Sequence, residues 1–188
     1  TQYAYDNANN LTTLTANSGA RRTYSYDDDN LVSSEARYDA QNNWLVTYAF
    51  AYDPTHNLTS ETETRPNQTA LTTTRAYDDL NRLVSITDPY GATTGYTFDA
   101  AGNLIGQTDP SGFSTSITPN PSNLPETTVH RDANQNIVAT TTNTYTAANE
   151  LESWTTTDPN YALTLNSNLH YNGNGYIDQA NISHTSAN

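Results

Sequence analysis

The sequence has 188 residues, a net charge of −13, 34% hydrophobic residues, 14 tyrosines and no cysteine or lysine. An acidic chain without clustered positive charge is a poor partner for nucleic acid or anionic membranes, because phosphate binding needs cationic patches. The lack of cysteine excludes disulfides and thiol nucleophiles, and the lack of an apolar run of about 18 residues argues against membrane insertion. Low hydrophobicity alone would indicate disorder, but the many tyrosines favour a thin sheet with much exposed area.

One pattern recurs along the chain: an aromatic residue, an aspartate, four further residues and an apolar residue. Nine copies begin, in chain order, at Tyr5, Tyr26, Tyr38, Tyr52, Tyr77, Phe98, Arg131, Tyr145 and Tyr171. The copy at Tyr26, YDDDNL, is interpreted as one residue shorter than the others, and the last three copies are weaker. Self-similarity of this kind predicts a repeat architecture.

An aspartate follows the first residue in seven of the nine copies, at Asp6, Asp27, Asp39, Asp53, Asp78, Asp99 and Asp132. A short carboxylate can accept a hydrogen bond from a backbone N–H two residues on, and so begins a turn. The aromatic and apolar residues that bracket the turn can face each other across two antiparallel strands.

Each turn needs one residue that tolerates a positive φ, a conformation favoured by Gly and by Asn, Asp and His among other side chains. The candidates stand two residues before the apolar residue, at Asn9, Asn42, His56, Asn81, Gly102, Asn149 and Gly175. Gln135 is the exception, in the copy that has also lost its aromatic residue. The recurrent turn chemistry supports the assignment of the repeat.

The segments between the turns are predicted to be strands. Alternate residues before the turns are aromatic or aliphatic, at Tyr3 and Tyr5, Tyr24 and Tyr26, Tyr48, Phe50 and Tyr52, Tyr96 and Phe98, and Leu169 and Tyr171. This period of two is typical of strands with one buried face. A second turn signal, Asp-Pro, occurs at Asp88, Asp109 and Asp158. The sequence therefore predicts an all-β array of antiparallel hairpins, and no segment has a convincing helical period.

The intervals between copies are uneven, and an interval of 14 residues occurs twice, from Tyr38 to Tyr52 and from Arg131 to Tyr145. This indicates a larger repeat in which short hairpins alternate with longer ones. We expect residues 1–188 to form a single repeat array, with an irregular joint at 113–128 around the stretch PNPSNLP.

Two stretches carry a family resemblance: YDDLNRLVSITDPYG from Tyr77, and FDAAGNL from Phe98 followed by TDPSG. They resemble the YD-repeat or Rhs-repeat family, which includes Rhs polymorphic toxins, the B/C subunits of Tc toxins, wall-associated proteins and teneurins. The resemblance implies a winding β-strip that encloses a hollow shell or forms the body of a large surface protein. The element DPxGLxGG of the family's plug is not matched, since DPSGF at Asp109 departs after the glycine.

Residue combinations with catalytic or ligand chemistry are weak. Asp27, Asp28 and Asp29 could bind calcium, but their spacing is not that of a calcium loop, so turn capping is favoured. The four histidines are scattered, and we predict no catalytic residue, cofactor or metal. Four N-x-S/T sequons mark candidate glycosylation sites at Asn10, Asn57, Asn67 and Asn181.

We therefore expect a non-enzymatic structural segment of a secreted or cell-surface bacterial protein. It would assemble through its strand edges, with identical copies or flanking repeats, as an extracellular filament or shell wall. One alternative is an adhesin that binds glycans or cell-surface partners. Another is a fragment of a toxin-encapsulating Rhs shell.

Overall fold

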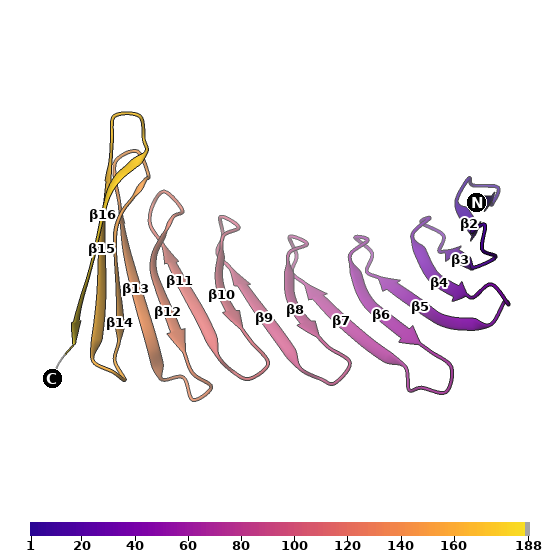
Figure 1. Cartoon of the computed structure of the whole chain (residues 1–188). Helices are drawn as coiled ribbons and strands as arrows, with labels where there is room; N and C mark the ends of the chain where they lie inside the picture. Colours follow the sequence, from indigo (N-terminus) through magenta and orange to yellow (C-terminus); the bar gives the residue numbers. More distant parts are fainter. Residues whose placement is uncertain (187–188) are drawn as a thin grey trace. The chain divides into compact units, whose positions relative to one another are not determined.

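The computed structural model describes residues 1–186, and these form strands and turns without a helix. Within each compact unit described below, the strands follow one another in sequence order (Figure 1), and neighbours in that order are hydrogen-bonded. The strands are β1 Gln2–Tyr5, β2 Leu11–Thr15, β3 Arg21–Tyr26, β4 Val32–Tyr38, β5 Trp44–Tyr52, β6 Leu58–Thr64, β7 Leu71–Tyr77, β8 Leu83–Thr87, β9 Thr93–Phe98, β10 Leu104–Thr108, β11 Ser114–Pro119, β12 Pro125–Arg131, β13 Ile137–Tyr145, β14 Leu151–Asp158, β15 Leu163–Tyr171 and β16 Ile177–Ser186. The predicted all-β fold of antiparallel hairpins is confirmed. Residues 1–186 hold no helix of the length and hydropathy that crossing a membrane requires.

The chain divides into two compact units, Thr1–Thr93 and Thr94–Asn188. The first unit holds β1 to β8 and the second holds β10 to β16, while β9 begins at the last residue of the first unit. The expected joint at 113–128 falls in the paired strands β11 and β12 of the second unit, where Ile117 pairs with Thr128. The joint, like a single array over the whole chain, stays a prediction.

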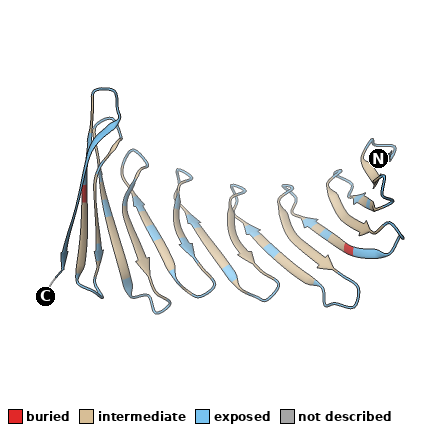
Figure 2. Cartoon of the chain, in the orientation of Figure 1, coloured by how far each residue is buried: buried red, intermediate tan, exposed pale blue. Residues whose placement is uncertain are grey.

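The strands form a thin layer with very little core. Among the described residues, only Val46 (4% exposed) and Ser167 (2% exposed) are buried, and most strand residues are half-buried, as Figure 2 shows. In the described part of each unit, contacts between strands join neighbours in the sequence only. Stability therefore comes from pairing between adjacent strands and from rows of side chains across them, rather than from a second packed layer.

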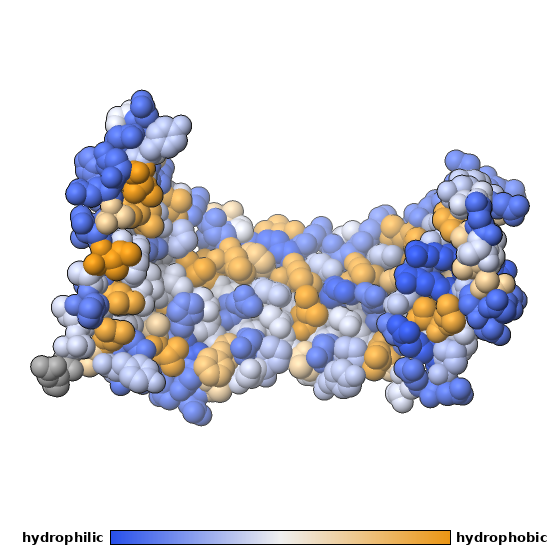
Figure 3. Space-filling view, in the orientation of Figure 1, coloured by the Kyte–Doolittle hydropathy of each residue, from blue (hydrophilic) through white to orange (hydrophobic). Residues whose placement is uncertain are grey.

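Successive side chains alternate between two faces, so each face has its own composition. In the first unit, one face carries tyrosines together with charged residues: the Arg37 guanidinium lies 5.0 Å from the Tyr48 ring centroid, and its Nε donates to Glu35 Oε1 at 2.6 Å. The other face carries small and hydroxylated residues, such as Thr62 and Thr72, whose Oγ1 atoms are hydrogen-bonded at 2.9 Å. Figure 3 accordingly shows apolar residues in short patches among polar ones.

Candidate functional site

The turns share one hydrogen-bonded geometry, which Asp53 illustrates. Its backbone N–H donates to the Asn57 carbonyl at 3.0 Å, and the His56 N–H donates to the Asp53 carbonyl at 2.9 Å. The Asp53 Oδ1 then accepts from the N–H groups of Thr55 and Asn57, both at 2.9 Å. The corresponding Oδ1 accepts backbone N–H groups at Asp6, Asp27, Asp39, Asp78, Asp99 and Asp132. The carboxylate of the repeat thus closes its own turn.

A second side chain, which the sequence pattern did not single out, completes this cap. The residue directly before the apolar position is often Asn, and its Nδ2 donates to the other carboxylate oxygen of the aspartate. This contact occurs from Asn10, Asn43, Asn57, Asn103 and Asn136, at 2.8–3.2 Å. In one copy Arg82 replaces the Asn and donates through Nε to Asp78 Oδ2 at 2.7 Å. The recurrence of Asn at that position is the sequence signal from which this contact could have been predicted.

These hydrogen bonds favour the ionised aspartate. Partial desolvation raises the pKa of Asp53, but the side-chain and backbone N–H groups of Asn57 and the contacts from Thr55 outweigh it and lower the pKa to about 2. The side chains of Asn43 and Asn103 likewise lower the pKa of Asp39 and of Asp99. The acidic character of the chain is therefore partly a property of its turns.

The fourth residue after the first position has a positive φ in all nine copies, between 60° and 93°. These residues are Asn9, Asn30, Asn42, His56, Asn81, Gly102, Gln135, Asn149 and Gly175. Gln135 adopts a φ of 67° like the others, although glutamine is not among the residue types enriched in that conformation. One interpretation of the sequence was wrong here. The copy at Tyr26 is not shorter: Tyr26 pairs with Val32 rather than Leu31, as Tyr5 pairs with Leu11, and the loop has the common length.

Turns alternate between the two long sides of each unit because successive strands are antiparallel. In the first unit Tyr5, Tyr26, Tyr52 and Tyr77 all precede turns on one side, and Tyr38 precedes a turn on the other. In the second unit Phe98, Pro119, Tyr145 and Tyr171 share a side, and Arg131 lies opposite. We call the side with the turns after Tyr5, Tyr26, Tyr52 and Tyr77, and the side with the turns after Phe98, Pro119, Tyr145 and Tyr171, the tyrosine side of each unit. The intervals between the repeat copies looked uneven because copies from both sides were counted together. Successive first positions on the tyrosine side alone are 21 to 26 residues apart.

Tyrosine hydroxyls on this side connect each hairpin to the preceding one. The Tyr52 hydroxyl, for example, donates to the carbonyl of Val32, the first residue of β4, at 3.0 Å. The same contact, which we call the tyrosine staple, runs from Tyr26 to Leu11, from Tyr77 to Leu58, from Tyr145 to Pro125 and from Tyr171 to Leu151, at 2.8–3.1 Å. The staple fixes the register between hairpins and explains why the repeat uses Tyr more often than Phe.

Side chains of successive turns also contact each other on the tyrosine side. The Asn10 amide donates to Asn30 Oδ1 at 2.8 Å, and the Asn57 amide donates to Asn81 Oδ1 at 2.8 Å. In each of these pairs the acceptor is the positive-φ residue of the next turn. The turn residues therefore both close a loop and bind its neighbour.

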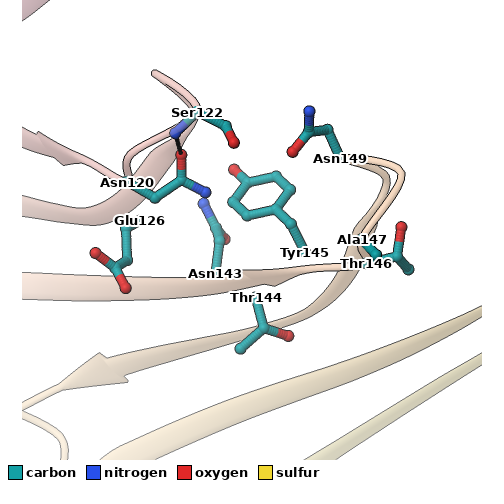
Figure 4. A pocket seen from close by; sticks show the side chains of 9 residues that line it. All are labelled: Asn120, Ser122, Glu126, Asn143, Thr144, Tyr145, Thr146, Ala147 and Asn149. Atoms are coloured by element: carbon teal, nitrogen blue, oxygen red, sulfur yellow. Dashed lines mark hydrogen bonds between the residues drawn. The ribbon is translucent and has the colours of Figure 1, made fainter.

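A shallow polar groove of about 420 Å³ lies on the tyrosine side of the second unit, between the turns that follow β11 and β13. Figure 4 shows the Tyr145 ring within this groove, together with Glu126, Asn143 and Asn149. The Tyr145 hydroxyl and the Asn143 amide both donate to the Pro125 carbonyl at 2.8 Å. An aromatic ring edged by carboxylate and amide groups could bind a small polar ligand.

The two edge strands of the sheet, β1 and β16, are the most exposed elements of the structure. All ten residues of β16 are exposed, including Ile177 (53%) and Ile182 (72%). Tyr3 and Tyr5 in β1 are each 57% exposed. Unpaired strand edges with exposed apolar residues are surfaces on which another strand can pair.

The other sequence-predicted sites are dispersed. The amide groups of the sequon residues Asn10 and Asn57 are bound to aspartates, whereas Asn67 lies exposed in a turn and Asn181 on the edge strand. Glycosylation of these residues stays a prediction. Asp27 caps its turn through the N–H groups of Asp29 and Leu31. Within residues 1–186, no three His, Asp or Glu side chains gather as a metal site would require.

Comparisons with known proteins agree with this geometry. The sequence model of the family described as RHS Repeat matches residues 77–115, the region where the sequence resemblance was strongest. The crystal structure of TcdB2-TccC3-TEV superposes with a TM-score of 0.54 at 14% identity, and the Tc holotoxin pore of Photorhabdus luminescens, with a substituted TccC3, superposes with a TM-score of 0.55 at 18% identity.

Each of these superpositions covers 96% of this chain but only 11% of the longer chain. At such identities the likeness concerns the fold. No curated protein matches the sequence. The family match and the common fold confirm the resemblance to YD and Rhs repeats.

Proposed function

We propose that the chain is a non-enzymatic wall segment of a larger secreted or cell-surface bacterial assembly, because residues 77–115 match the RHS Repeat model and hairpins with the same turn follow one another in both units. It would continue through its strand edges into flanking repeats or further subunits, as part of a shell or a filament. One of the two neighbouring folds belongs by name to a holotoxin pore, and the chain spans 11% of the length of each. Encapsulation of a toxin is therefore one form that the proposed wall could take.

The tyrosine staple is the observation that carries this proposal. Five tyrosine hydroxyls donate hydrogen bonds to carbonyl groups of the preceding hairpin, and most turn aspartates accept hydrogen bonds that close their own turns. The polar groups that recur along the chain thus serve register and turn closure. Hydrogen bonds that hold one hairpin to the next are what a wall built from repeated hairpins requires.

Imaging of the native particle tests the proposal. We expect electron micrographs of the protein isolated from its source to show the chain as part of a shell or filament, and antibodies against its turns to decorate that particle on intact cells. A discrete monomeric native protein, or one confined to the cell interior, would contradict the wall function.

A second candidate, glycan recognition, is favoured by the groove around Tyr145. The ring, the Glu126 carboxylate and the Asn149 amide there offer the mixture of apolar and polar contact that sugars bind. Titration of the protein with neutral oligosaccharides, followed by NMR, should shift the groove residues, and Glu126→Gln with Asn149→Ala should abolish the shifts. The variant Gln68→Ala, at an exposed residue of the first unit, is the control. Unchanged spectra with every oligosaccharide would remove this candidate.

A further inference from the structure

The turn between β15 and β16 has a neutral cap where most copies of the repeat have a charged one. Asn172 stands in the place of the aspartate. Its Oδ1 accepts the N–H groups of Asn174 at 2.9 Å and of Tyr176 at 3.1 Å, which are the contacts that a carboxylate oxygen makes at Asp53. The exchange of one amide for a carboxylate is therefore all that separates this cap from those of the seven copies with aspartate.

The residue that follows Asn172 makes this exchange chemically accessible. That residue is Gly173, and Asn-Gly pairs occur in the sequence only at 172–173 and 174–175. A backbone nitrogen can attack the side-chain carbonyl carbon of the preceding asparagine, and glycine hinders the attack least because it has no side chain. Gly173 is exposed, and a Cβ atom added to it would meet no atom within 4 Å. Within the described residues its N–H donates no hydrogen bond, so the nitrogen is available.

The turn also places hydrogen-bond donors where the attack develops charge. Addition to Cγ of Asn172 puts negative charge on Oδ1, and the two N–H groups that already bind this oxygen would stabilise it, as in an oxyanion hole. The second Asn-Gly pair lacks both advantages. The Gly175 N–H donates to the Asn172 carbonyl at 2.9 Å, and in the described part of the chain the Asn174 side chain accepts no hydrogen bond. The turn thus distinguishes Asn172 from Asn174.

We propose that Asn172 is a site of self-catalysed deamidation, which converts the neutral cap of this turn into the charged cap of the other copies. The Gly173 nitrogen bonds to Cγ of Asn172 and gives up its proton, while the bond from Cγ to Nδ2 breaks and ammonia leaves with that proton. Water then adds its hydroxyl to Cγ of the cyclic imide. The bond between Cγ and the Gly173 nitrogen breaks, the nitrogen takes the remaining proton of the water, and an aspartate is left at position 172.

The same hydrogen bonds favour one direction of ring opening. Water could instead add to the main-chain carbonyl carbon of residue 172, which would leave an isoaspartyl linkage with an extra methylene in the backbone. Donors at a carbonyl oxygen activate its carbon. The side-chain oxygen of Asn172 has two such donors, whereas the main-chain oxygen has one, the Gly175 N–H. We therefore expect aspartate to be the main product in the folded turn.

The chain contains a matched turn that cannot react. Asn120 also replaces the aspartate, and its Oδ1 accepts the N–H groups of Ser122 at 2.9 Å and of Leu124 at 3.0 Å. The next residue is Pro121, whose nitrogen carries no hydrogen and cannot form the neutral imide. The two turns therefore share the cap and differ in the nucleophile, so Asn120 should stay an amide.

Mass spectrometry of digests tests the proposal after the full chain has been kept in a mildly alkaline buffer. Residue 172 should gain about 1 Da, the difference between an amide and a carboxylic acid. It should convert at least about 10-fold faster than residue 174, because only its oxygen has the donors. In the same chain unfolded in guanidinium chloride, the two residues should react at similar rates and give a larger share of isoaspartate.

Two variants separate the chemistry from the cap. Gly173→Pro removes the nucleophile and should abolish the conversion, and it should preserve the turn because Pro54 and Pro110 directly follow the capping aspartate in other turns. Asn172→Asp carries the expected product from the start. It should slow hydrogen exchange at the Tyr176 N–H, since a carboxylate binds an N–H more strongly than an amide does.

Three results would overturn the inference. The first is equal conversion of residues 172 and 174 in the folded chain, or no conversion of residue 172. The second is conversion that persists in Gly173→Pro, which would show hydrolysis without the neighbouring nitrogen. The third is isoaspartate as the main product of the folded chain, which would show that the reaction damages the cap. The wall function does not depend on residue 172 and is judged separately by imaging.

Discussion

The aspartate of the repeat acts through its hydrogen bonds, and its charge is what makes them strong. In the turn at Asp53 one oxygen accepts two backbone N–H groups and the other accepts the Asn57 amide at 3.0 Å. Charge-assisted hydrogen bonds of this kind are shorter and stronger than neutral ones. Protonation of the carboxylate would weaken all of them together.

Acid should therefore unfold the protein over a defined range of pH. The pKa of Asp53 is lowered from 3.8 to about 2, and that of Asp6, Asp39, Asp99 and Asp132 is also lowered. A lowered folded-state pKa adds stability above the unfolded-state pKa, and this stability is lost as the pH falls toward the folded-state value. Urea midpoints should be nearly constant from pH 7 to pH 5 and fall between about pH 4 and pH 2. A midpoint that rises in that window would contradict the cap.

The tyrosine staple gives a prediction with an internal control. Tyr52→Phe removes the hydroxyl that donates to the Val32 carbonyl at 3.0 Å but keeps the half-buried ring, so it should lower the free energy of unfolding by about 0.5–1.5 kcal/mol. Tyr5→Phe removes a hydroxyl that lacks a staple and should have little effect. Urea unfolding at low protein concentration measures both variants. Equal losses from the two would show that the staple contributes no stability.

At the scale of the element, the unit of the structure is the turn with its two flanking residues. The residue at positive φ decides which substitutions the turn tolerates, because a β-branched side chain resists that conformation. Gly102, at a φ of 93°, and Asn81, at 60°, occupy the same place in two hairpins. A Cβ atom added at Gly102 would meet no atom within 4 Å, so the positive φ rather than crowding at Cβ is the expected source of the cost there.

Gly102→Val should accordingly lower the free energy of unfolding by more than about 1 kcal/mol. Asn81→Gly should be close to neutral, apart from the loss of the acceptor that Asn81 offers to Asn57. Gly102→Asn, which restores the residue type most frequent at this position, is the matched control and should cost less than Val. Thermal unfolding of the three variants decides the matter, and similar behaviour of Val and Asn would refute the argument.

The hairpins themselves could be predicted from the sequence because their signals are local. An aromatic residue, an aspartate and an Asn or Gly four positions after the aromatic all lie within one turn. The side on which each turn lies could not be found this way, since Tyr38 and Tyr52 carry the same motif and differ only in strand polarity. The sequence pattern suggested Leu31 as the apolar residue opposite Tyr26. The strand pairing shows that it is Val32, because this loop has the same length as the others.

The candidate assembly surface was predictable in kind but not in detail. From the sequence we expected assembly through strand edges. The staple from Tyr52 to Val32 joins residues 20 positions apart, and no local sequence pattern predicts it. The hydrogen bond from the Asn side chain to the aspartate, illustrated by Asn43 and Asp39, does have a sequence signal, because Asn recurs directly before the apolar position. Contacts within a turn were therefore accessible from the pattern, and contacts between hairpins were not.

At the scale of the whole molecule, the strands within residues 1–186 contact only their sequence neighbours in each unit, so stability is distributed along the chain. In such quasi-one-dimensional proteins the terminal repeats have one stabilising neighbour and the internal repeats have two. Hydrogen exchange at low concentration should be fastest in β1 and β16, and slower in strands that pair on both sides, such as β5 and β13. Mass spectrometry of peptic fragments measures this gradient. Uniform exchange along the chain would instead indicate a single cooperative unit.

The thinness of the core has an evolutionary consequence. A protein with a deep core can rarely gain or lose a hairpin, because every layer is packed against several others. Here each pair of strands is bound to the next by a ladder and, in most cases, by one hydroxyl on one carbonyl. A duplication or deletion of 21 to 26 residues that begins and ends at equivalent tyrosines, such as Tyr26 and Tyr52, restores the same junction. Genes for such chains can therefore change the reach of their product by unequal recombination, one hairpin at a time, without redesigning any other contact.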